Sequence, residues 1–188
     1  MLQTFKTTLL IFVALTLVTG VLYPLAITAA ALGLFPDQAR GSLVSAEGQV
    51  IGSKWIGQPT RDPRYFWMRP SAVDYAPLPS GATNLGLTSE VLISQMAARA
   101  AFWRETHPTQ AAEDIPADLL SASASGLDPH ISPAAARFQI ERVAAARQLD
   151  AAQVAELVEA AIEPPQFGLL GQARVNVLLL NRALDALE

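Results

Sequence analysis

The feature that most constrains this chain is a run of 30 residues, from Thr7 to Pro36, that contains no charged side chain. About 20 residues in a helix suffice to cross the hydrocarbon core of a bilayer. The run therefore predicts a transmembrane helix over residues 7–34, after a short cytoplasmic tail over residues 1–6 and before a domain over residues 35–188. Pro24 interrupts the run, which a spanning helix tolerates when neighbouring helices or waters satisfy the freed carbonyl group.

A cleaved signal peptide is the alternative interpretation of the same run. Lys6 would be its positive region, and the small residues Ala29–Ala31 would form its cleavage site. The apolar part of a signal peptide has about 7–15 residues, roughly half of this run, so a retained anchor is favoured. Lys6 and Arg40 flank the run with almost no charge bias. The short N-terminal segment predicts a cytoplasmic N-terminus and an extracytoplasmic domain.

The rest of the chain is acidic. Residues 37–188 contain 12 basic and 17 acidic side chains. Nucleic-acid binding depends on lysine and arginine side chains that displace counterions from phosphates, so this balance argues against a nucleic-acid partner. Cysteine is absent, which excludes thiol nucleophiles, disulfides and cysteine metal ligands.

Turn, capping and proline signals predict an α+β domain. A hairpin is expected around a turn at residues 45–48, with Trp55–Gly57 continuing its second strand. Five prolines within residues 59–79 predict an ordered but irregular segment. Ser132 followed by Pro133 predicts the start of a helix that runs to about Gln148. Further helices are expected over residues 89–106, 150–163 and 178–187, and extended segments over 118–120 and 174–177.

The segment Ser121–Ser132 gathers serine, aspartate and histidine side chains and raises the question of hydrolase chemistry. A membrane-anchored hydrolase would use Ser125 or Ser132 as its nucleophile with His130, and Asp128 with His130 could instead hold a metal ion. However, no Gly-x-Ser-x-Gly elbow is present, and a triad draws its members from separate elements. A turn that caps the helix at Pro133 is favoured, and we assign no catalytic, cofactor-binding or metal-binding residue.

Two other segments could bind anions. Arg61, Arg64 and Arg69 surround the aromatic residues Tyr65–Trp67, as in a platform for an anion or a single nucleic-acid strand. A half-buried strand edge is favoured over that platform, with protein contact as the next interpretation. Backbone amides of Gly81–Gly86 could also bind an anion, although a structural turn is favoured there because no strand and helix frame the segment.

The other histidine of the chain, His107, precedes Pro108 where the helix over residues 89–106 is expected to end. It is interpreted as a surface residue at a helix end. The glycine-rich motif that cradles nucleotide phosphates, Gly-x-x-x-x-Gly-Lys-Ser/Thr, does not occur in the sequence. The residue patterns alone therefore predict neither a metal site nor a nucleotide site.

Several short motifs follow one another from Gly52 to the end of the chain. They are Gly52-Ser53-x-x-Ile56-Gly57-Gln58, Tyr65-Phe66-x-x-Arg69-Pro70-Ser71-Ala72, Ser80-Gly81-x-x-Asn84-Leu85-Gly86, Ser123–Pro133, Gln139 with Arg142-Val143-Ala144 and Ala146-Arg147, and Arg174-Val175-Asn176-Val177-Leu178-x-Leu180-Asn181-x-Ala183-Leu184-Asp185. With one anchor in front, this series resembles the C subunit of the Kdp-type potassium-transporting ATPase over essentially the whole chain. Ala82 and Ala173 depart from the family pattern, which usually has glycine and proline there. Alanine at position 82 would be strained if its turn required a positive φ.

The resemblance implies an accessory, non-catalytic subunit of an ATP-driven complex that imports potassium across a bacterial inner membrane. Its implied partners are a channel-forming, potassium-binding subunit, an ATP-hydrolysing subunit and membrane lipid. ATP and K⁺ would act through those partner subunits, and this chain would hold no cofactor alone. The family is described as a catalytic chaperone that raises the ATP affinity of the hydrolysing subunit, and a glutamine-dependent nucleotide contact has been proposed for it. An external domain cannot touch cytoplasmic ATP, so we expect action through assembly and the outer mouth of the channel-forming subunit.

Overall fold

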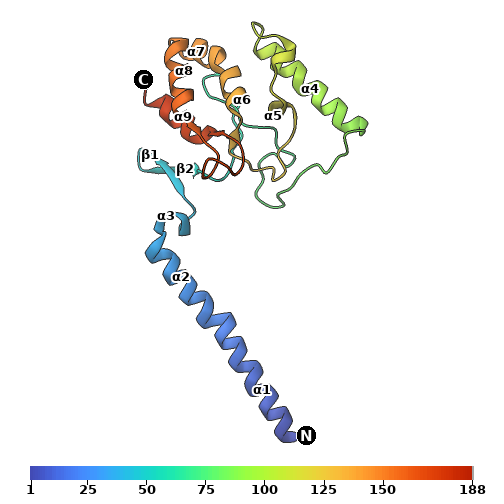
Figure 1. Ribbon diagram of the computed structural model, residues 1–188, viewed down its shortest axis with the longest axis vertical. Helices are drawn as coiled ribbons and strands as arrows, with labels where there is room; N and C mark the ends of the chain where they lie inside the picture. The colour runs from blue at the N-terminus through green and yellow to red at the C-terminus, as the bar shows by residue number, and fades with distance from the viewer. Residues whose placement is uncertain (188) are drawn as a thin grey trace. The chain divides into compact units, whose positions relative to one another are not determined.

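The computed structural model describes residues 1–187, and the chain divides into two compact units (Figure 1). The first unit is Met1–Ile51 and the second is Gly52–Glu188. Each unit has its own architecture and is described by itself.

The first unit is dominated by one continuous helix over Leu2–Leu34, 33 residues long. It consists of α1 (Leu2–Leu17), a π-helical turn (Val18–Leu22) and α2 (Tyr23–Leu34), and none of its residues is buried. At about 1.5 Å per residue the helix is about 50 Å long, more than the roughly 30 Å of a hydrocarbon core. The predicted apolar helix is confirmed, and by length and composition it can span a membrane.

The π-helical turn explains how Pro24 fits inside this helix. Proline has no amide hydrogen, and its ring collides with the carbonyl group four residues earlier in a regular α-helix, here that of Gly20. The backbone N–H of Tyr23 donates instead to the carbonyl of Val18, five residues back. π-Helices are rare and occur mostly as such single-turn bulges inside α-helices.

After the helix, the chain forms α3 (Pro36–Ala39) and a hairpin of β1 (Leu43–Ala46) and β2 (Gln49–Ser53). The two turn residues, Glu47 and Gly48, both have positive φ, of 50° and 79°. Two positive φ values in a two-residue loop give the turn whose twist matches that of paired strands. The expected hairpin is confirmed, but β2 ends at Ser53, so Trp55–Gly57 does not continue the strand.

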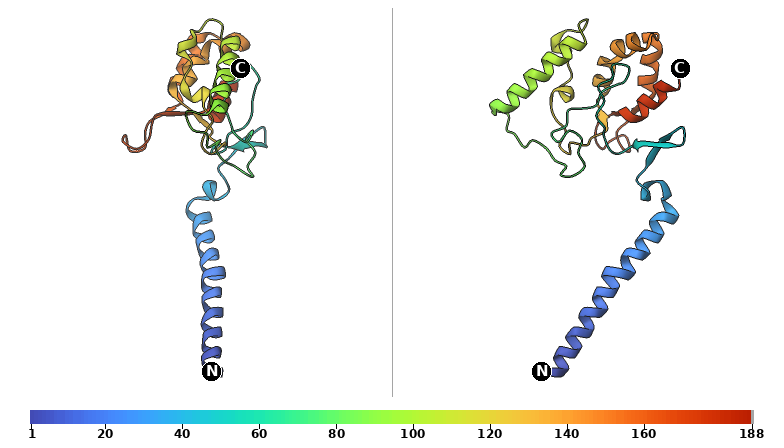
Figure 2. Two further views of the ribbon diagram at one scale, coloured as in Figure 1. Left: turned by 90° about the vertical axis from the view of Figure 1, so that its right-hand side faces the viewer. Right: turned by 180° about the vertical axis from the view of Figure 1, so that it is seen from behind.

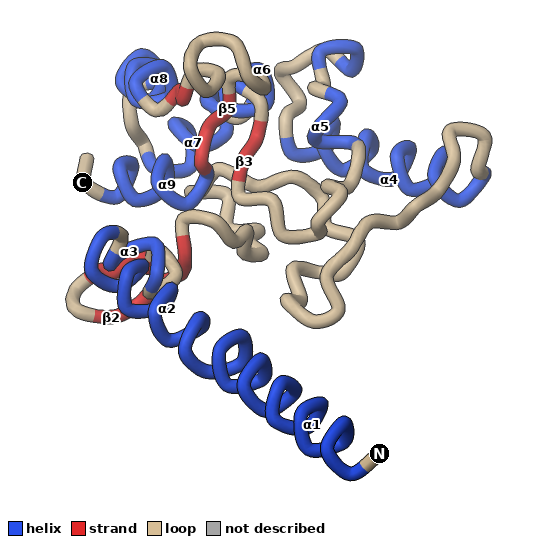
Figure 3. Tube along the Cα trace, turned by 60° about the horizontal axis from the view of Figure 1, so that its bottom comes forward, coloured by secondary structure: helices blue, strands red, loops and turns tan. Residues whose placement is uncertain are grey.

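The second unit combines helices with a small antiparallel sheet. Its elements are α4 (Glu90–Thr106), a 3₁₀ turn (Ala112–Asp114), α5 (Ala117–Leu120), β3 (His130–Ile131), α6 (Pro133–Phe138), α7 (Ile140–Arg147), α8 (Ala151–Ala160), β4 (Ile162–Glu163), β5 (Arg174–Asn176) and α9 (Val177–Asp185). The strand order is β3–β5–β4, with Val175 of β5 opposite Ile131 on one side and Ile162 on the other. Figure 3 shows β3 and β5 side by side in this unit. An α+β domain behind one apolar helix is therefore the observed fold class.

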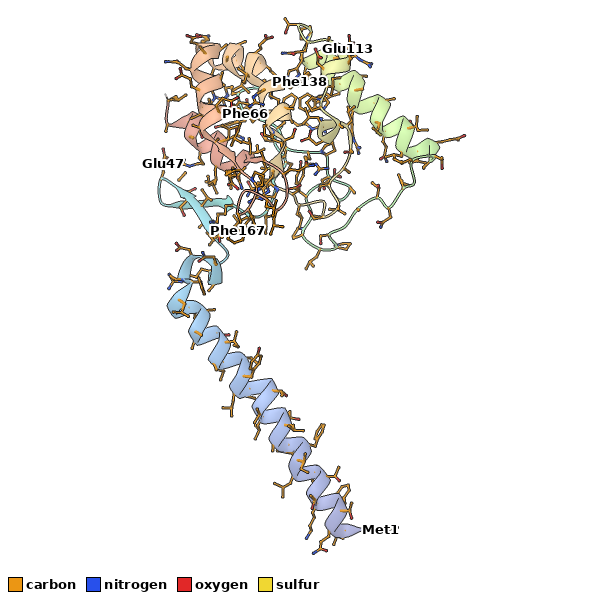
Figure 4. All side chains as sticks on the ribbon, in the orientation of Figure 1. Met1, Glu47, Phe66, Glu113, Phe138 and Phe167 are labelled. Atoms are coloured by element: carbon orange, nitrogen blue, oxygen red, sulfur yellow. The ribbon has the colours of Figure 1, made fainter. Side chains whose placement is uncertain are left out.

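The core of the second unit is built by α6, α8 and α9 against the sheet and the irregular segment 62–70. Val154 and Val158 of α8 and Leu184 of α9 are fully buried, as is Phe66 of the irregular segment. Figure 4 shows Phe66 and Phe138 among other side chains in the interior of this unit. Full burial of such side chains stabilises a fold by about 1.5–3 kcal/mol each.

Three further predicted elements differ from the structure. The helix expected over residues 150–163 ends at Ala160, and Ile162–Glu163 form β4. The helix expected from Pro133 to about Gln148 is two helices, because the chain tightens at Gln139, whose N–H bonds to the carbonyl of Ala136 three residues back. This tightening coincides with an inward-facing Gln139 side chain, which is fully buried. Residues 118–120, expected to be extended, belong to the single helical turn α5, which buries Leu119.

Candidate functional site

The serine-, aspartate- and histidine-rich segment 121–132 is a series of turns closed by its own polar side chains. The Ser123 hydroxyl accepts a hydrogen bond from the N–H of Gly126, and the Ser125 hydroxyl accepts one from the N–H of Leu127, at 2.9 and 3.0 Å. The Asp128 carboxylate accepts from the N–H of His130 at 3.0 Å. Short polar side chains commonly stabilise turns in this way, so the segment has a structural role here.

Ser132 caps a helix, as the sequence predicts. Its hydroxyl oxygen accepts from the N–H of Ala135 at 3.0 Å and donates to a carboxylate oxygen of Asp118 at 3.0 Å. Its backbone N–H donates to the other Asp118 oxygen at 2.8 Å. A hydroxyl oxygen that accepts from the N–H of the third residue of a helix serves as its N-terminal cap.

His130 lies in a shallow cavity of about 310 Å³ together with Arg69, Asp128 and Ser132. Its ring Nδ1 is 3.3 Å from Asp128, whose other oxygen accepts from Arg69 at 3.3 Å. Burial raises the pKa of Asp128, but hydrogen bonds from His130 and the charge of Arg69 outweigh it and hold that pKa below its usual value. Within residues 1–187, no hydrogen bond joins His130 to Ser125 or Ser132, and no group of three or more acidic or histidine side chains could hold a metal ion.

The centre of the second unit is an irregular segment, residues 63–67, whose backbone groups are bound by helix side chains. The amide of Gln139 donates to the carbonyl of Trp67 and accepts from its N–H, at 3.1 and 2.7 Å. The side-chain amide of Asn181 in α9 likewise donates to the carbonyl of Phe66 and accepts from its N–H, at 3.0 and 2.8 Å. A buried backbone group without a partner is costly, and these two amides replace the strand neighbour that the segment lacks.

Two arginines complete this binding of the segment. Arg142 donates to the carbonyls of Pro63 and Tyr65, at 2.6 and 3.1 Å, and its guanidinium lies 3.8 Å from the Trp67 ring centroid. Arg147 donates to the carbonyl of Arg64 at 2.8 Å and to Asp185 at 2.6 Å. Burial lowers the pKa of Arg142 to about 10, which leaves it charged at neutral pH. The guanidinium fork suits such multiple carbonyl contacts.

His107 is buried, which corrects the expectation of a surface residue. It does end α4, but only 3% of it is exposed, and its ring centroid lies 4.7 Å from that of Phe138 and 5.1 Å from that of Trp103. Its Nε2 accepts from Arg142 at 3.2 Å, so its proton lies on Nδ1, 3.0 Å from the Thr106 hydroxyl. Burial, with the nearby charge of Arg142, lowers the pKa of His107 to about 4.

The three arginines around Tyr65–Trp67 do not form an open platform. Arg64 pairs with Asp62 at 2.8 Å, Arg69 pairs with Asp128, and the guanidinium carbon of Arg61 lies 5.4 Å from the Phe102 ring centroid. Only 7% of Trp67 is exposed and Phe66 is fully buried. A cleft of about 650 Å³ remains between the segment 59–75 and α4, with Arg61 and Phe102 in its lining. The aromatic run is thus more deeply buried than a strand edge.

Two glycines allow close approach of backbone to backbone. Gly126 has a φ of 71°, and a Cβ there would lie 2.5 Å from the Val73 side chain and 2.9 Å from the carbonyl oxygen of Gly81. A Cβ on Gly57 would lie 2.8 Å from the carbonyl oxygen of Asp128. The segment 81–86 thus packs beside a turn. In this part of the chain Asn84, not Ala82, has a positive φ, so the strain considered for Ala82 does not arise.

Residue patterns alone did not reveal the roles of Gln139, Arg142, Arg147 and Asn181. All four stand within the motifs that carry the family resemblance. However, their hydrogen bonds to the backbone of residues 63–67 join positions that are 72 to 115 residues apart in the sequence. A signal for these roles in the sequence is that the four polar side chains occupy positions that the helix periodicity predicts to be buried. The structure thus defines a class: an α+β protein with one candidate membrane-spanning helix and a domain whose polar motifs maintain its own fold.

Comparison with known proteins makes the assignment more specific. Residues 5–186 match the family model described as K⁺-transporting ATPase, c chain (KdpC). The potassium-transporting ATPase KdpC subunit of Burkholderia vietnamiensis is 52% identical over 183 residues, 95% of this chain and 93% of the relative. That of Methylococcus capsulatus is 49% identical over 191 residues, which cover both chains completely. The chain belongs to the KdpC family.

Proposed function

We propose that this chain is the accessory, non-catalytic subunit of an ATP-driven complex that imports potassium with high affinity across a bacterial inner membrane. The observation that carries the proposal is similarity along the whole chain, from the apolar helix to α9, to relatives named as subunits of a potassium-transporting ATPase. Its partners are a channel-forming, potassium-binding subunit and an ATP-hydrolysing subunit. The helix Leu2–Leu34 contributes one span and contacts lipid.

In this proposal the N-terminus is cytoplasmic and the domain is extracytoplasmic. The domain promotes assembly and acts at the outer mouth of the channel-forming subunit. Its excess of acidic over basic side chains, 17 to 12 over residues 37–188, supports this location, because a negative surface modestly concentrates cations at an entrance.

The effect of this subunit on ATP affinity is indirect in this account. As a catalytic chaperone the chain raises the ATP affinity of the hydrolysing subunit by stabilising one conformation of the complex, since a ligand or partner shifts an equilibrium only through its preference for one state. Gln139 takes no part in nucleotide binding in this account, because both ends of its amide are engaged with Trp67, Ala135 and Arg142. That side chain has no free group to offer a nucleotide.

The test is purification of the complex from potassium-limited cells through a tag on this chain. The chain is expected to leave the membrane with two large polytopic partners. Complexes depleted of the chain are expected to need more ATP for half-maximal hydrolysis, while the isolated full-length chain in detergent binds ATP no better than a denatured control. Solitary purification, or nucleotide binding by the isolated chain as tight as that of the complex, would overturn the proposal.

A further inference from the structure

The connection between β4 and β5 is an apolar hairpin that projects from the second unit. Residues 164–173 contain no charged side chain. At its tip 96% of Phe167, 84% of Leu169 and 57% of Leu170 are exposed. Figure 2 (left) shows this hairpin reaching away from the rest of the unit, and Figure 4 labels Phe167 at the unit's edge.

The hairpin is preorganised. At its base Glu163 of β4 and Arg174 of β5 face each other in register and form an ion pair at 3.0 Å. Towards the tip, Gln166 and Leu170 exchange two backbone hydrogen bonds of 2.9 Å. Phe167 has a φ of 55°, unusual for a bulky residue. A fixed shape of this kind lowers the entropy lost on binding.

The apolar tip is unlike an isolated surface leucine. Three large apolar side chains lie within four residues, with glycines between and after them and no charge nearby. Contiguous apolar patches of a few hundred Å² on soluble surfaces commonly mark interaction sites. Exposed aromatic and leucine side chains held on a rigid turn have the character of anchors that enter a pocket.

The charges around the tip favour a groove on a protein, rather than a lipid surface, as the surface that the tip binds. Stable association with an anionic bilayer needs free lysine or arginine beside the inserted side chains. Here the nearest basic residue, Arg174, is paired with Glu163, and residues 37–188 carry 17 acidic against 12 basic side chains. Such a domain is repelled from an anionic headgroup layer, whereas an uncharged groove on a protein imposes no such repulsion.

We propose that Phe167, Leu169 and Leu170 form a docking knob that inserts into an apolar groove on the extracytoplasmic surface of the channel-forming subunit. This inference rests on the proposed function, which supplies the partner and its side of the membrane. It adds the segment of this chain that makes the contact and the apolar chemistry of the surface that receives it.

The test compares two double variants of the full chain in the assembled complex. Phe167→Ser with Leu169→Ser removes the knob, whereas Leu78→Ser with Leu87→Ser removes two leucines that are 88% and 90% exposed on another segment. We expect co-purification of the channel-forming subunit to fall at least tenfold with the first variant and less than twofold with the second. Equal recovery with both variants, or equal loss, would overturn the docking knob.

A photo-crosslinking amino acid at position 167, activated in intact potassium-limited cells, gives the second readout. An adduct with the channel-forming subunit is expected. An adduct only with lipid, or only with the ATP-hydrolysing subunit, contradicts the inference. If the wild-type chain itself fails to co-purify with any partner, the proposed function fails; if the wild type co-purifies and the knob variant does so equally, only the docking inference fails.

Discussion

The side-chain amide of Gln139 hydrogen-bonds both backbone groups of Trp67, a residue 72 positions earlier in the chain. Gln139 is fully buried, and 7% of Trp67 is exposed. The same amide oxygen accepts from Arg142 at 2.7 Å. The Gln139 side chain therefore connects the break between α6 and α7 to the irregular segment 63–67. It also holds the Arg142 guanidinium in place over the Trp67 ring.

Replacement of Gln139 by Leu is expected to lower the free energy of unfolding by about 2–5 kcal/mol. Leucine leaves the Trp67 N–H and C=O buried without partners, and each such group costs about 1–3 kcal/mol. Urea unfolding of the detergent-solubilised chain, followed by tryptophan fluorescence, measures the change. Gln153→Leu, at an exposed position of α8, is the matched control and should stay within about 0.5 kcal/mol of wild type. Equal effects of the two substitutions would contradict the role assigned to Gln139.

Stability should depend on pH through His107. Its pKa is about 4 in the folded chain, against an ordinary value of 6.5, so between these values the unfolded chain binds a proton that the folded chain does not. Stability is then complete above pH 6.5 and falls as the pH drops towards 4. A pKa unit corresponds to about 1.4 kcal/mol, so we expect a loss of roughly 1–3 kcal/mol over this window.

The measurement for His107 is urea unfolding at several pH values between 4 and 7.5 for wild type and His107→Gln. Glutamine can still accept from Arg142 but does not titrate. The difference in free energy of unfolding between the two chains should shrink as the pH falls. A difference independent of pH would show that His107 does not titrate as described.

Gly126→Ala is expected to destabilise the chain more than Gly168→Ala. The two glycines have nearly the same φ, 71° and 72°, but a Cβ at 126 would lie 2.5 Å from Val73, whereas nothing lies within 4 Å of a Cβ at 168. The conformational term, about 1–2 kcal/mol, is therefore common to both. Overpacking adds about 1–3 kcal/mol at Gly126 alone. Thermal unfolding of the two variants side by side tests this, and equal shifts would rule out the close approach.

Ser132→Ala should reduce stability by about 1 kcal/mol through loss of the helix cap. Growth of cells on limiting potassium should nevertheless persist, because the hydroxyl serves Ala135 and Asp118 rather than a reaction. Ser125→Ala, which removes a turn bond to Leu127, is the companion variant. Loss of growth with either variant at wild-type protein levels would revive the hydrolase alternative.

Local signals in the sequence predicted those elements whose cause is local. The helix start at Ser132-Pro133, the helix that begins near residue 150 and the hairpin around residues 45–48 depend on neighbouring residues, and the structure has each of them. The break at Gln139 was not predicted, because its amide bonds to a distant segment. The burial of His107 was not predicted for the same reason. The rings around it are those of Trp103 in α4, Phe138 in α6 and Trp67 in the irregular segment 63–67.

In the candidate site, too, roles with a local cause could be predicted and roles that depend on distant contacts could not. Within Ser121–Ser132 the residues alone favoured a turn over a catalytic group, because serine and aspartate close turns within two or three positions. The roles of Arg142, Arg147 and Asn181 could not be predicted in this way, because each pairs with the backbone of residues 63–67 far away in sequence. Such pairings follow from the packing of α7 and α9, which no local pattern encodes.

The central claim is that one membrane-spanning helix has its N-terminus in the cytoplasm and carries an extracytoplasmic domain. Labelling of single cysteines tests this topology most directly. The chain has no cysteine of its own, so Ala186→Cys, at an exposed position after α9, and Gln3→Cys, at an exposed position of α1, each report one location. With an impermeant maleimide on intact spheroplasts, we predict labelling at position 186 and protection at position 3 until the cells are lysed. Protection at position 186 in intact spheroplasts, with labelling only after lysis, would contradict the account.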